Sequence, residues 1–276
     1  MTAAEMTWLV PIAAMLGAGL FAGFAGGLFG IGGGFVVVPA LFGVLPLLGG
    51  GKAELAHVAI GTSLATIIVT SLRSVQAHAK RGAVDFDVLK SWAPWIVLGV
   101  GGGVLLASRV SSPMLAIIFG AGVLLMSLHF LFPILSGRQL ASEMPGGAAR
   151  VGIAGGLGAF SSLLGIGGGT IAIIVMTLCG KSIHRAIATA SGIGFIIALP
   201  GMVGFVAIGL GAHGLPMGSL GYVNLPAAIA IASTSILTAP LGAAAAHRMS
   251  PAVLRTIFGL YLVFVGFTMI RNGLAA

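Results

Sequence analysis

The run LFGIGGG occupies Leu28–Gly34, and a near copy, LLGIGGG, occupies Leu163–Gly169, 135 residues later. Both runs interrupt apolar stretches, and their glycines can adopt backbone conformations that end one helix and begin another. Non-helical backbone is tolerated at membrane depth only where protein buries it or where it lines a cavity. Paired interruptions at corresponding positions of two halves are typical of transporters built from internal repeats. We call Gly30–Gly34 and Gly165–Gly169 the first and second glycine turns.

The composition identifies a multi-pass membrane protein. Hydrophobic residues make up 58% of the 276-residue chain and charged residues only 7%, against about 25% charged residues in soluble domains. We therefore expect a chain embedded in a lipid bilayer. The net charge of +8 comes without the aromatic platforms of a nucleic-acid-binding surface, so no nucleic-acid partner is expected. Positive charge in cytoplasmic loops explains it instead.

Ten apolar segments follow one another, separated by Pro, Gly or charged residues. In the first half they are Thr7–Leu28, Phe35–Leu48, Ala53–Ala79, Val88–Ala107 and Pro113–Leu135. In the second half they are Val151–Leu164, Thr170–Cys179, Ile183–Leu210, Tyr222–Ala246 and Pro251–Ile270. A polar linker at residues 136–150 separates an N-terminal membrane repeat (1–135) from a C-terminal one (151–276).

Two further stretches match between the halves. HVAIGTS at His57–Ser63 aligns with HRAIATA at His184–Ala190. SRVSSPMLAIIFG at Ser108–Gly120 aligns with HRMSPAVLRTIFG at His247–Gly259. Because these stretches and the glycine turns keep their order, the sequence indicates one duplication.

Segment length predicts an all-α fold with broken helices. A spanning helix needs about 20 residues, and the last three segments of each half reach that length. Thr170–Cys179 would cover about half of the hydrocarbon core. Each repeat is therefore expected to have a broken or re-entrant helical hairpin followed by three spanning helices. Full spanning by the first member of each hairpin is left open.

Charge predicts the orientation of the repeats. If the linker is cytoplasmic, nine of the thirteen Lys and Arg residues fall on the cytoplasmic side and three outside, as the positive-inside rule requires. The inner set is Lys80, Arg81, Lys90, Arg138, Arg150, Lys181, Arg185, Arg248 and Arg255, and the outer set is Lys52, Arg109 and Arg271. The segments Ala53–Ala79 and Ile183–Leu210 then run in opposite directions. The two repeats are expected to be inverted, with both termini outside.

The glycine turns are the candidate substrate site. The helix that begins after each turn offers unpaired N–H groups and the positive end of its dipole, which together attract an anion. Inverted symmetry would bring both turns together near the bilayer midplane. The residues assigned to this site are Gly30, Gly32, Gly33, Gly34, Gly165, Gly167, Gly168, Gly169 and Thr170. The alternative is that these glycines only allow close helix packing.

Hydroxyl side chains inside the segments are further candidates for substrate binding. They are Thr62, Ser63, Ser161, Ser162, Thr189 and Ser191. A hydroxyl can donate to an anion without the cost of a buried charge. The alternative is that it bonds to a neighbouring helix or to a carbonyl of its own helix.

Arg73 is the one cation inside a span and away from its first turn. A charge at the bilayer centre costs about 2.5–3.5 kcal/mol on insertion scales. Arg73 precedes Ala79 by six residues, about 9 Å of helical rise, so its side chain could reach the membrane surface. A snorkelling side chain and a substrate-binding or gating residue both remain open.

The acidic residues are informative because they lie at segment ends or in loops. This placement argues against a cation carrier, a carboxylate proton relay and an enzyme with two catalytic carboxylates. The six histidines show no metal-ligand spacing, and the single cysteine cannot form a thiolate cluster. No metal, cofactor or enzymatic activity is expected, and a homodimer is left open.

The chain resembles the TauE/SafE-type sulfite exporter family, also called the 4-toluene sulfonate uptake permease family. The resemblance lies in GGLFGIGGGFVVVPAL, HVAIGTSLATIIVTSLRSVQAHAKRGAVD and LLGIGGGTIAI. It implies an integral membrane transporter, typically bacterial, for sulfite, sulfonates or related sulfur-containing anions. By position it points to both glycine turns, to Thr62 and Ser63, and to Arg73. The second repeat departs from the first, because Ala190 stands opposite Ser63 and Arg73 has no counterpart.

Residues and resemblance together predict a secondary transporter of a small sulfur-containing anion. The anion would bind between the two glycine turns, and alternating access would export it. A passive anion channel of the same architecture is the alternative.

Overall fold

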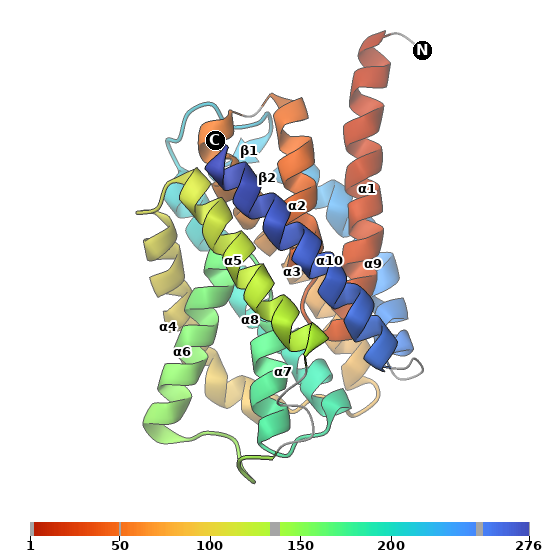
Figure 1. Ribbon diagram of the computed structural model, residues 1–276, viewed down its shortest axis with the longest axis vertical. Coiled ribbons are helices and arrows are strands. Elements are labelled where there is room, and N and C mark those ends of the chain that lie inside the picture. Colours follow the sequence, from red (N-terminus) through yellow and green to blue (C-terminus); the bar gives the residue numbers. More distant parts are fainter. Residues whose placement is uncertain (1–2, 50, 133–138, 247–250, 276) are drawn as a thin grey trace.

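The computed structural model describes residues 3–49, 51–132, 139–246 and 251–275, and nearly all of its regular structure is helical (Figure 1). Within these residues, eight helices are long and apolar enough to cross a membrane, and two shorter apolar helices follow the glycine turns. The all-α, polytopic fold is confirmed.

The helix bounds lie close to the predicted segments. The long helices are α1 (Ala3–Phe29), α3 (Leu55–Ala79), α4 (Phe86–Ala107), α5 (Ser112–Leu131), α6 (Gly147–Leu164), α8 (Ile183–Gly209), α9 (Leu225–Ala245) and α10 (Pro251–Leu274). The short helices are α2 (Gly34–Val44) and α7 (Gly169–Leu178), with single 3₁₀ turns η1 (Leu45–Leu48) and η2 (Lys52–Glu54). Two short strands, β1 (Ser219–Leu220) and β2 (Val223–Asn224), pair before α9.

Three details refine the predicted segments. Both α1 and α6, the first helices of the two hairpins, are long enough to span. Helix α6 begins at Gly147, inside the expected linker 136–150. Linker residues 136–138 with Arg138, and residues 247–250 with Arg248 and Ser250, lie outside the described residues.

Helix α3 is central to the molecule. In its membrane window 72% of the residues are buried, against 39–50% in the other candidate spans. It packs on α8 and α9, and also on α2. Its contacts with α8 are antiparallel, because Gly61 meets Phe205 near one end and Ser74 meets Ser191 near the other. The helices that carry the matching HVAIGTS and HRAIATA segments therefore run in opposite directions.

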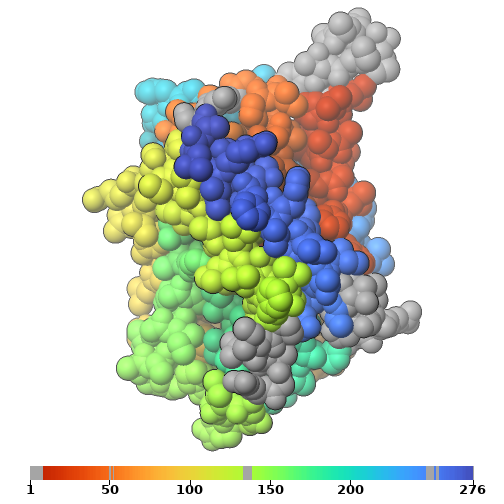
Figure 2. All heavy atoms as spheres, viewed as in Figure 1, coloured from red at the N-terminus to blue at the C-terminus, as the bar shows by residue number. Residues whose placement is uncertain are grey.

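Helix pairings between the halves correspond to one another. Each of these pairs joins a helix of one half to a helix of the other. The α1–α9 pair corresponds to the α6–α4 pair, and the α3–α9 pair corresponds to the α8–α4 pair. Helices α5 and α10, which carry the third matched stretch, pack on each other. They cover one face of the molecule (Figures 1 and 2), and large apolar side chains on them are exposed there, as on a surface that contacts lipid. Both ends of the described chain lie at one end of the molecule, which we call the terminal end, and residues 139–146 lie at the opposite linker end.

An ion pair joins two loops at the linker end. Asp85 caps α4, and its carboxylate accepts from Lys181 Nζ at 3.1 Å and lies 3.5 Å from Arg185 Nε. Burial by itself would raise the pKa of Asp85, but the hydrogen bond from Lys181 and the charges of Lys181 and Arg185 hold it below the ordinary value of 3.8. The carboxylate fixes the α3–α4 loop to the start of α8.

Replacement of this carboxylate is expected to make stability less dependent on pH. Because its pKa is lowered on folding, Asp85 contributes stability above its ordinary pKa, and that contribution is lost as pH falls through the folded pKa. Asp85→Asn, which keeps a capping side chain, should cost about 1 kcal/mol at pH 7. The thermal unfolding temperature in detergent should be higher for the wild type than for Asp85→Asn at pH 7, and this difference should disappear below about pH 4.

The exposed neighbour Asp87 provides the control, since Asp87→Asn removes the same charge from the first turn of α4. An equal effect of both substitutions at pH 7 would contradict the assignment.

Candidate functional site

The two glycine turns have the left-handed backbone that their sequence predicts. Positive φ angles occur at Gly30 (68°), Gly32 (74°) and Gly33 (82°) in the first turn, and at Gly165 (62°) and Gly168 (66°) in the second. An L-residue with a side chain pays about 1–2 kcal/mol for this conformation. Only glycine can therefore end α1 and α6 and restart the chain so abruptly.

The turns lie against each other, backbone to backbone. A Cβ on Gly34 would overlap the carbonyl oxygen of Gly165, and a Cβ on Gly169 would overlap that of Gly30. The N–H of Gly167 donates to the carbonyl of Ile31 at 3.3 Å, directly across the contact. The first residue of each short helix therefore abuts the opposite turn. The predicted meeting of the two turns is present in the structure.

The short helices leave this contact in opposite directions. Helix α2 extends toward the terminal end and α7 toward the linker end (Figure 1). The N-cap residues are Gly33 and Gly168. Because glycine has no side chain, no N-cap side chain accepts a hydrogen bond from the first N–H groups of either helix. The positive ends of both dipoles thus point to one buried centre, where a carbonyl of the opposite turn lies beside each helix start. In this arrangement the centre is closed.

Three buried hydroxyls near the turns have no hydrogen-bond partner among the described residues. They are Ser71 Oγ, Ser161 Oγ and Thr170 Oγ1, on residues that are 1%, 0% and 4% exposed. Ser71 Oγ is 3.3 Å from the position of a Cβ on Gly32, and Ser161 Oγ is 2.8 Å from that of a Cβ on Gly168. An unpaired buried hydroxyl is costly. A donor without a partner beside an uncapped helix start is the arrangement expected of an anion site.

Sequence reasoning identified Ser161 and Thr170 but missed Ser71. Its signal was present, since Ser63, Thr66, Thr70 and Ser74 follow at helical spacing on α3 and are all buried. Ser71 lies next to that stripe. The comparison of the repeats did not reveal it, because the corresponding position in α8 is Ala198.

The matched threonines have a structural partner each. Thr62 Oγ1 accepts the backbone N–H of Asn224 at 2.9 Å, and Thr189 Oγ1 accepts the backbone N–H of Asp85 at 2.9 Å. Asn224 and Asp85 are the N-caps of α9 and α4. Each threonine hydroxyl therefore anchors the start of a neighbouring helix.

The remaining predicted hydroxyls are also engaged. Ser63 Oγ donates to the Gly165 carbonyl at 2.8 Å and so touches the second turn. Ser162 Oγ donates to the Ala159 carbonyl at 3.0 Å, within its own helix. Ser191 Oγ lies 2.9 Å from Ser74 Oγ and joins α8 to α3. Of these three hydroxyls, that of Ser63 bonds to a glycine turn, whereas Ser162 contacts the second turn through its backbone carbonyl, which accepts from Gly165 N–H at 3.3 Å.

Arg73 lies apart from the turns. Its side chain is exposed and lines a cavity of about 290 Å³ with Lys80 and Arg81, toward the linker end of α3. The structure therefore agrees with a side chain that reaches out of the core.

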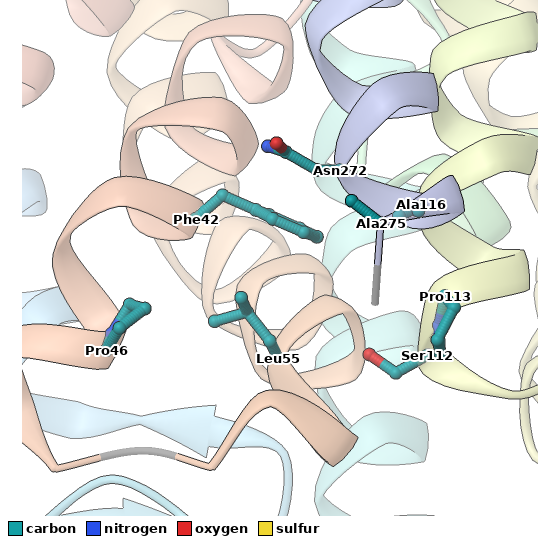
Figure 3. A pocket seen from close by; sticks show the side chains of 9 residues that line it. Phe42, Pro46, Leu55, Ser112, Pro113, Ala116, Asn272 and Ala275 are labelled. Atoms are coloured by element: carbon teal, nitrogen blue, oxygen red, sulfur yellow. The ribbon is translucent and has the colours of Figure 1, made fainter.

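A second cavity, of about 230 Å³, lies at the other end of α3, between α2, α5 and α10 (Figure 3). Its lining is mainly apolar, with the polar side chains of Ser112 and Asn272. None of the described residues that line it is charged. Among the described residues, no group of three or more His, Cys, Asp or Glu side chains could hold a metal ion.

Residues 15–269 match the sulfite exporter TauE/SafE family. The chain belongs to this family. Its similarity to the family therefore extends over both repeats and both glycine turns. The chain is therefore a multi-pass membrane transporter, in agreement with the eight candidate spans among the described residues. A bacterial inner membrane is consistent with these findings.

Three relatives match over nearly the whole of both chains and carry a general description. A "probable membrane transporter protein" of Haemophilus influenzae is 34% identical, covering 91% of this chain and 95% of its own. Proteins so described from Bacillus subtilis and Methanocaldococcus jannaschii are 29% and 26% identical, over 93% and 96% of this chain and 96% and 98% of theirs. No solved structure matches the chain.

Substitutions at two threonines distinguish a hydroxyl of the candidate site from a hydroxyl that supports the fold, by their effects on the stability of the protein. Thr170→Val removes a hydroxyl that has no partner among the described residues. It should leave the thermal unfolding temperature unchanged or raise it, with a gain in the free energy of unfolding of up to about 1 kcal/mol. Thr62→Val removes the acceptor of a buried N–H and should cost about 1–3 kcal/mol. Thermal unfolding in detergent without added anion measures both. A loss at Thr170 as large as that at Thr62 would show that its hydroxyl is bonded in the protein.

Proposed function

We propose that this membrane transporter is a secondary carrier that exports a small sulfur-containing anion, sulfite or an organosulfonate, and binds it at the two glycine turns. The observation that carries the proposal is the reciprocal contact of the turns beside buried hydroxyls that have no partner. The family description, sulfite exporter, supports the substrate class. The antiparallel packing of α3 on α8 supports the inverted repeat on which alternating access would depend.

The closed contact suggests how an anion would be held. The carbonyls of Gly30 and Gly165 now lie beside the first residues of α7 and α2. If the turns move apart, the oxygens of an oxyanion can replace these carbonyls at the helix starts. The hydroxyls of Ser71, Ser161 and Thr170 would donate to the same anion. Ser63, released from the Gly165 carbonyl, would add a fourth donor.

Two states of this contact would give alternating access. With the turns in contact, their backbones block the centre of the molecule. Movement of one repeat, or of one hairpin, against the other would open the centre toward one end at a time. Anion binding is expected to stabilise the separated turns, because it supplies hydrogen-bond acceptors for donors that the closed contact leaves unpaired.

Gly168→Ala tests the site, with Gly214→Ala as a matched control. Both glycines have positive φ, 66° and 71°, so both variants bear the same backbone strain. A Cβ on Gly168 would crowd Ser161 Oγ at 2.8 Å, whereas a Cβ on Gly214 meets nothing within 4 Å. Sulfite efflux from proteoliposomes should fall at least tenfold for Gly168→Ala and stay near the wild-type rate for Gly214→Ala.

Equal rates for the two variants, at equal amounts of inserted protein, would contradict a substrate site at the turns. Counterflow under the same conditions distinguishes the mechanism. A carrier shows saturable exchange of labelled against unlabelled anion, and a channel shows unitary currents instead.

A further inference from the structure

A basic cleft lies between the linker end of α3 and helix α9. It has a volume of about 290 Å³, close to the lower limit of about 300 Å³ for small-molecule sites. Its lining residues are Arg73, Gln76, Ala77, Lys80, Arg81 and Pro240. The first four recur at positions i, i+3, i+4 and i+7 of α3 and so share one face of that helix. The cleft is therefore lined on the α3 side by the donor side chains of Arg73, Gln76 and Lys80, and α9 contributes Pro240.

The positive charge of this cleft is not neutralised within the described part of the chain. There, the ion pairs of Lys and Arg are those of Lys181 and Arg185, and both are made with Asp85. Arg73, Lys80 and Arg81 have no carboxylate partner among these residues. Three cations around one small cavity repel one another, and an anion between them would relieve that repulsion.

The donors suit an oxyanion in geometry as well as in charge. Arg73 presents a planar guanidinium, which binds sulfonate or phosphate oxygens in pairs. Arg81 Nη1 donates to the Ala243 carbonyl at 3.4 Å, so its guanidinium is tied to α9 at the edge of the cleft. Gln76 adds an amide donor, and Lys80 an ammonium. Four donor side chains thus line the cleft, all from α3 and the turn that directly follows it.

Exposed leucines lie beside the cleft. Leu72 on α3 and Leu237 and Leu241 on α9 are exposed, as expected of side chains that contact lipid. An oxyanion could therefore reach the cleft from the aqueous phase or as the headgroup of a neighbouring lipid. The recognised chemistry is the same in both cases.

We infer that the cleft of Arg73, Lys80 and Arg81 is a second anion site, which binds a sulfo or phospho oxyanion group independently of the glycine turns. It gives a role to Arg73, a cationic residue of the spanning helix α3 that does not lie at the glycine turns. The inference does not rest on the proposed function. Its failure and the failure of the turn site are distinguishable, because Gly168→Ala should keep binding at the cleft.

The test uses the full chain in phosphatidylcholine nanodiscs. The cleft variant carries Arg73→Gln, Lys80→Gln and Arg81→Gln together. The control carries Lys90→Gln, Arg109→Gln and Arg271→Gln, which remove the same charge from exposed positions outside the cleft. Lys80→Gln alone is a milder variant, in case the triple change impairs folding. One arm measures the shift of the thermal midpoint with added sulfate or inorganic phosphate. The other measures phosphatidylglycerol retained after its addition to the discs, by native mass spectrometry.

Loss of the sulfate or phosphate shift in the cleft variant, with the control like the wild type, supports a site for a soluble oxyanion. At least a tenfold loss of retained phosphatidylglycerol in that variant alone supports a lipid headgroup site. Lys80→Gln should weaken the same response severalfold. The inference is overturned if cleft and control variants behave alike in both arms, or if the wild type responds in neither.

Discussion

The central architecture of this protein depends on one contact, in which the backbones of the two glycine turns lie against each other. Gly34 lies against the Gly165 carbonyl and Gly169 against the Gly30 carbonyl, at distances that no side chain permits. Each turn ends one helix and starts another near the same point. Two hairpins can meet there only because both lack side chains at the crossing. The same absence leaves the starts of α2 and α7 uncapped, so the feature that closes the fold also creates the electrostatics of the site.

The hydroxyls around the turns divide into two groups by their partners. Thr62 and Thr189 each accept the backbone N–H of an N-cap residue and hold the starts of α9 and α4. Ser71, Ser161 and Thr170 are also buried, but their hydroxyls have no hydrogen-bond partner in the part of the chain that the structure describes. The first group repeats in both halves and serves the scaffold. The second does not repeat, since Ala198, Gly26 and Phe35 occupy the corresponding positions. The unpartnered hydroxyls therefore make the surroundings of the two turns asymmetric, with Ser71 from the first half and Ser161 and Thr170 from the second.

Much of the fold could be predicted, because membrane depth limits what the chain can do. Helix α7 was expected at Thr170–Cys179 and occupies Gly169–Leu178, since glycines bound it on both sides. The pairing of the turns followed from their duplication. The roles of Thr62 and Thr189 could not be predicted, because their partners lie 162 and 104 residues away. The β1–β2 hairpin was missed for a similar reason, since its four strand residues carry no periodic pattern. The side chain of Arg73 was ambiguous until the packing of α9 on α3 showed the cleft that it lines.

The most direct measurement is a cryo-electron microscopy map of the full chain in nanodiscs with selenite, the heavier analogue of sulfite, once selenite is shown to compete for sulfite efflux. The account predicts that the glycine turns are separated, with selenite density about 2.7–3.2 Å from the hydroxyls of Ser161 and Thr170. Turns that stay in contact under saturating selenite, with density only at other positions, would contradict it.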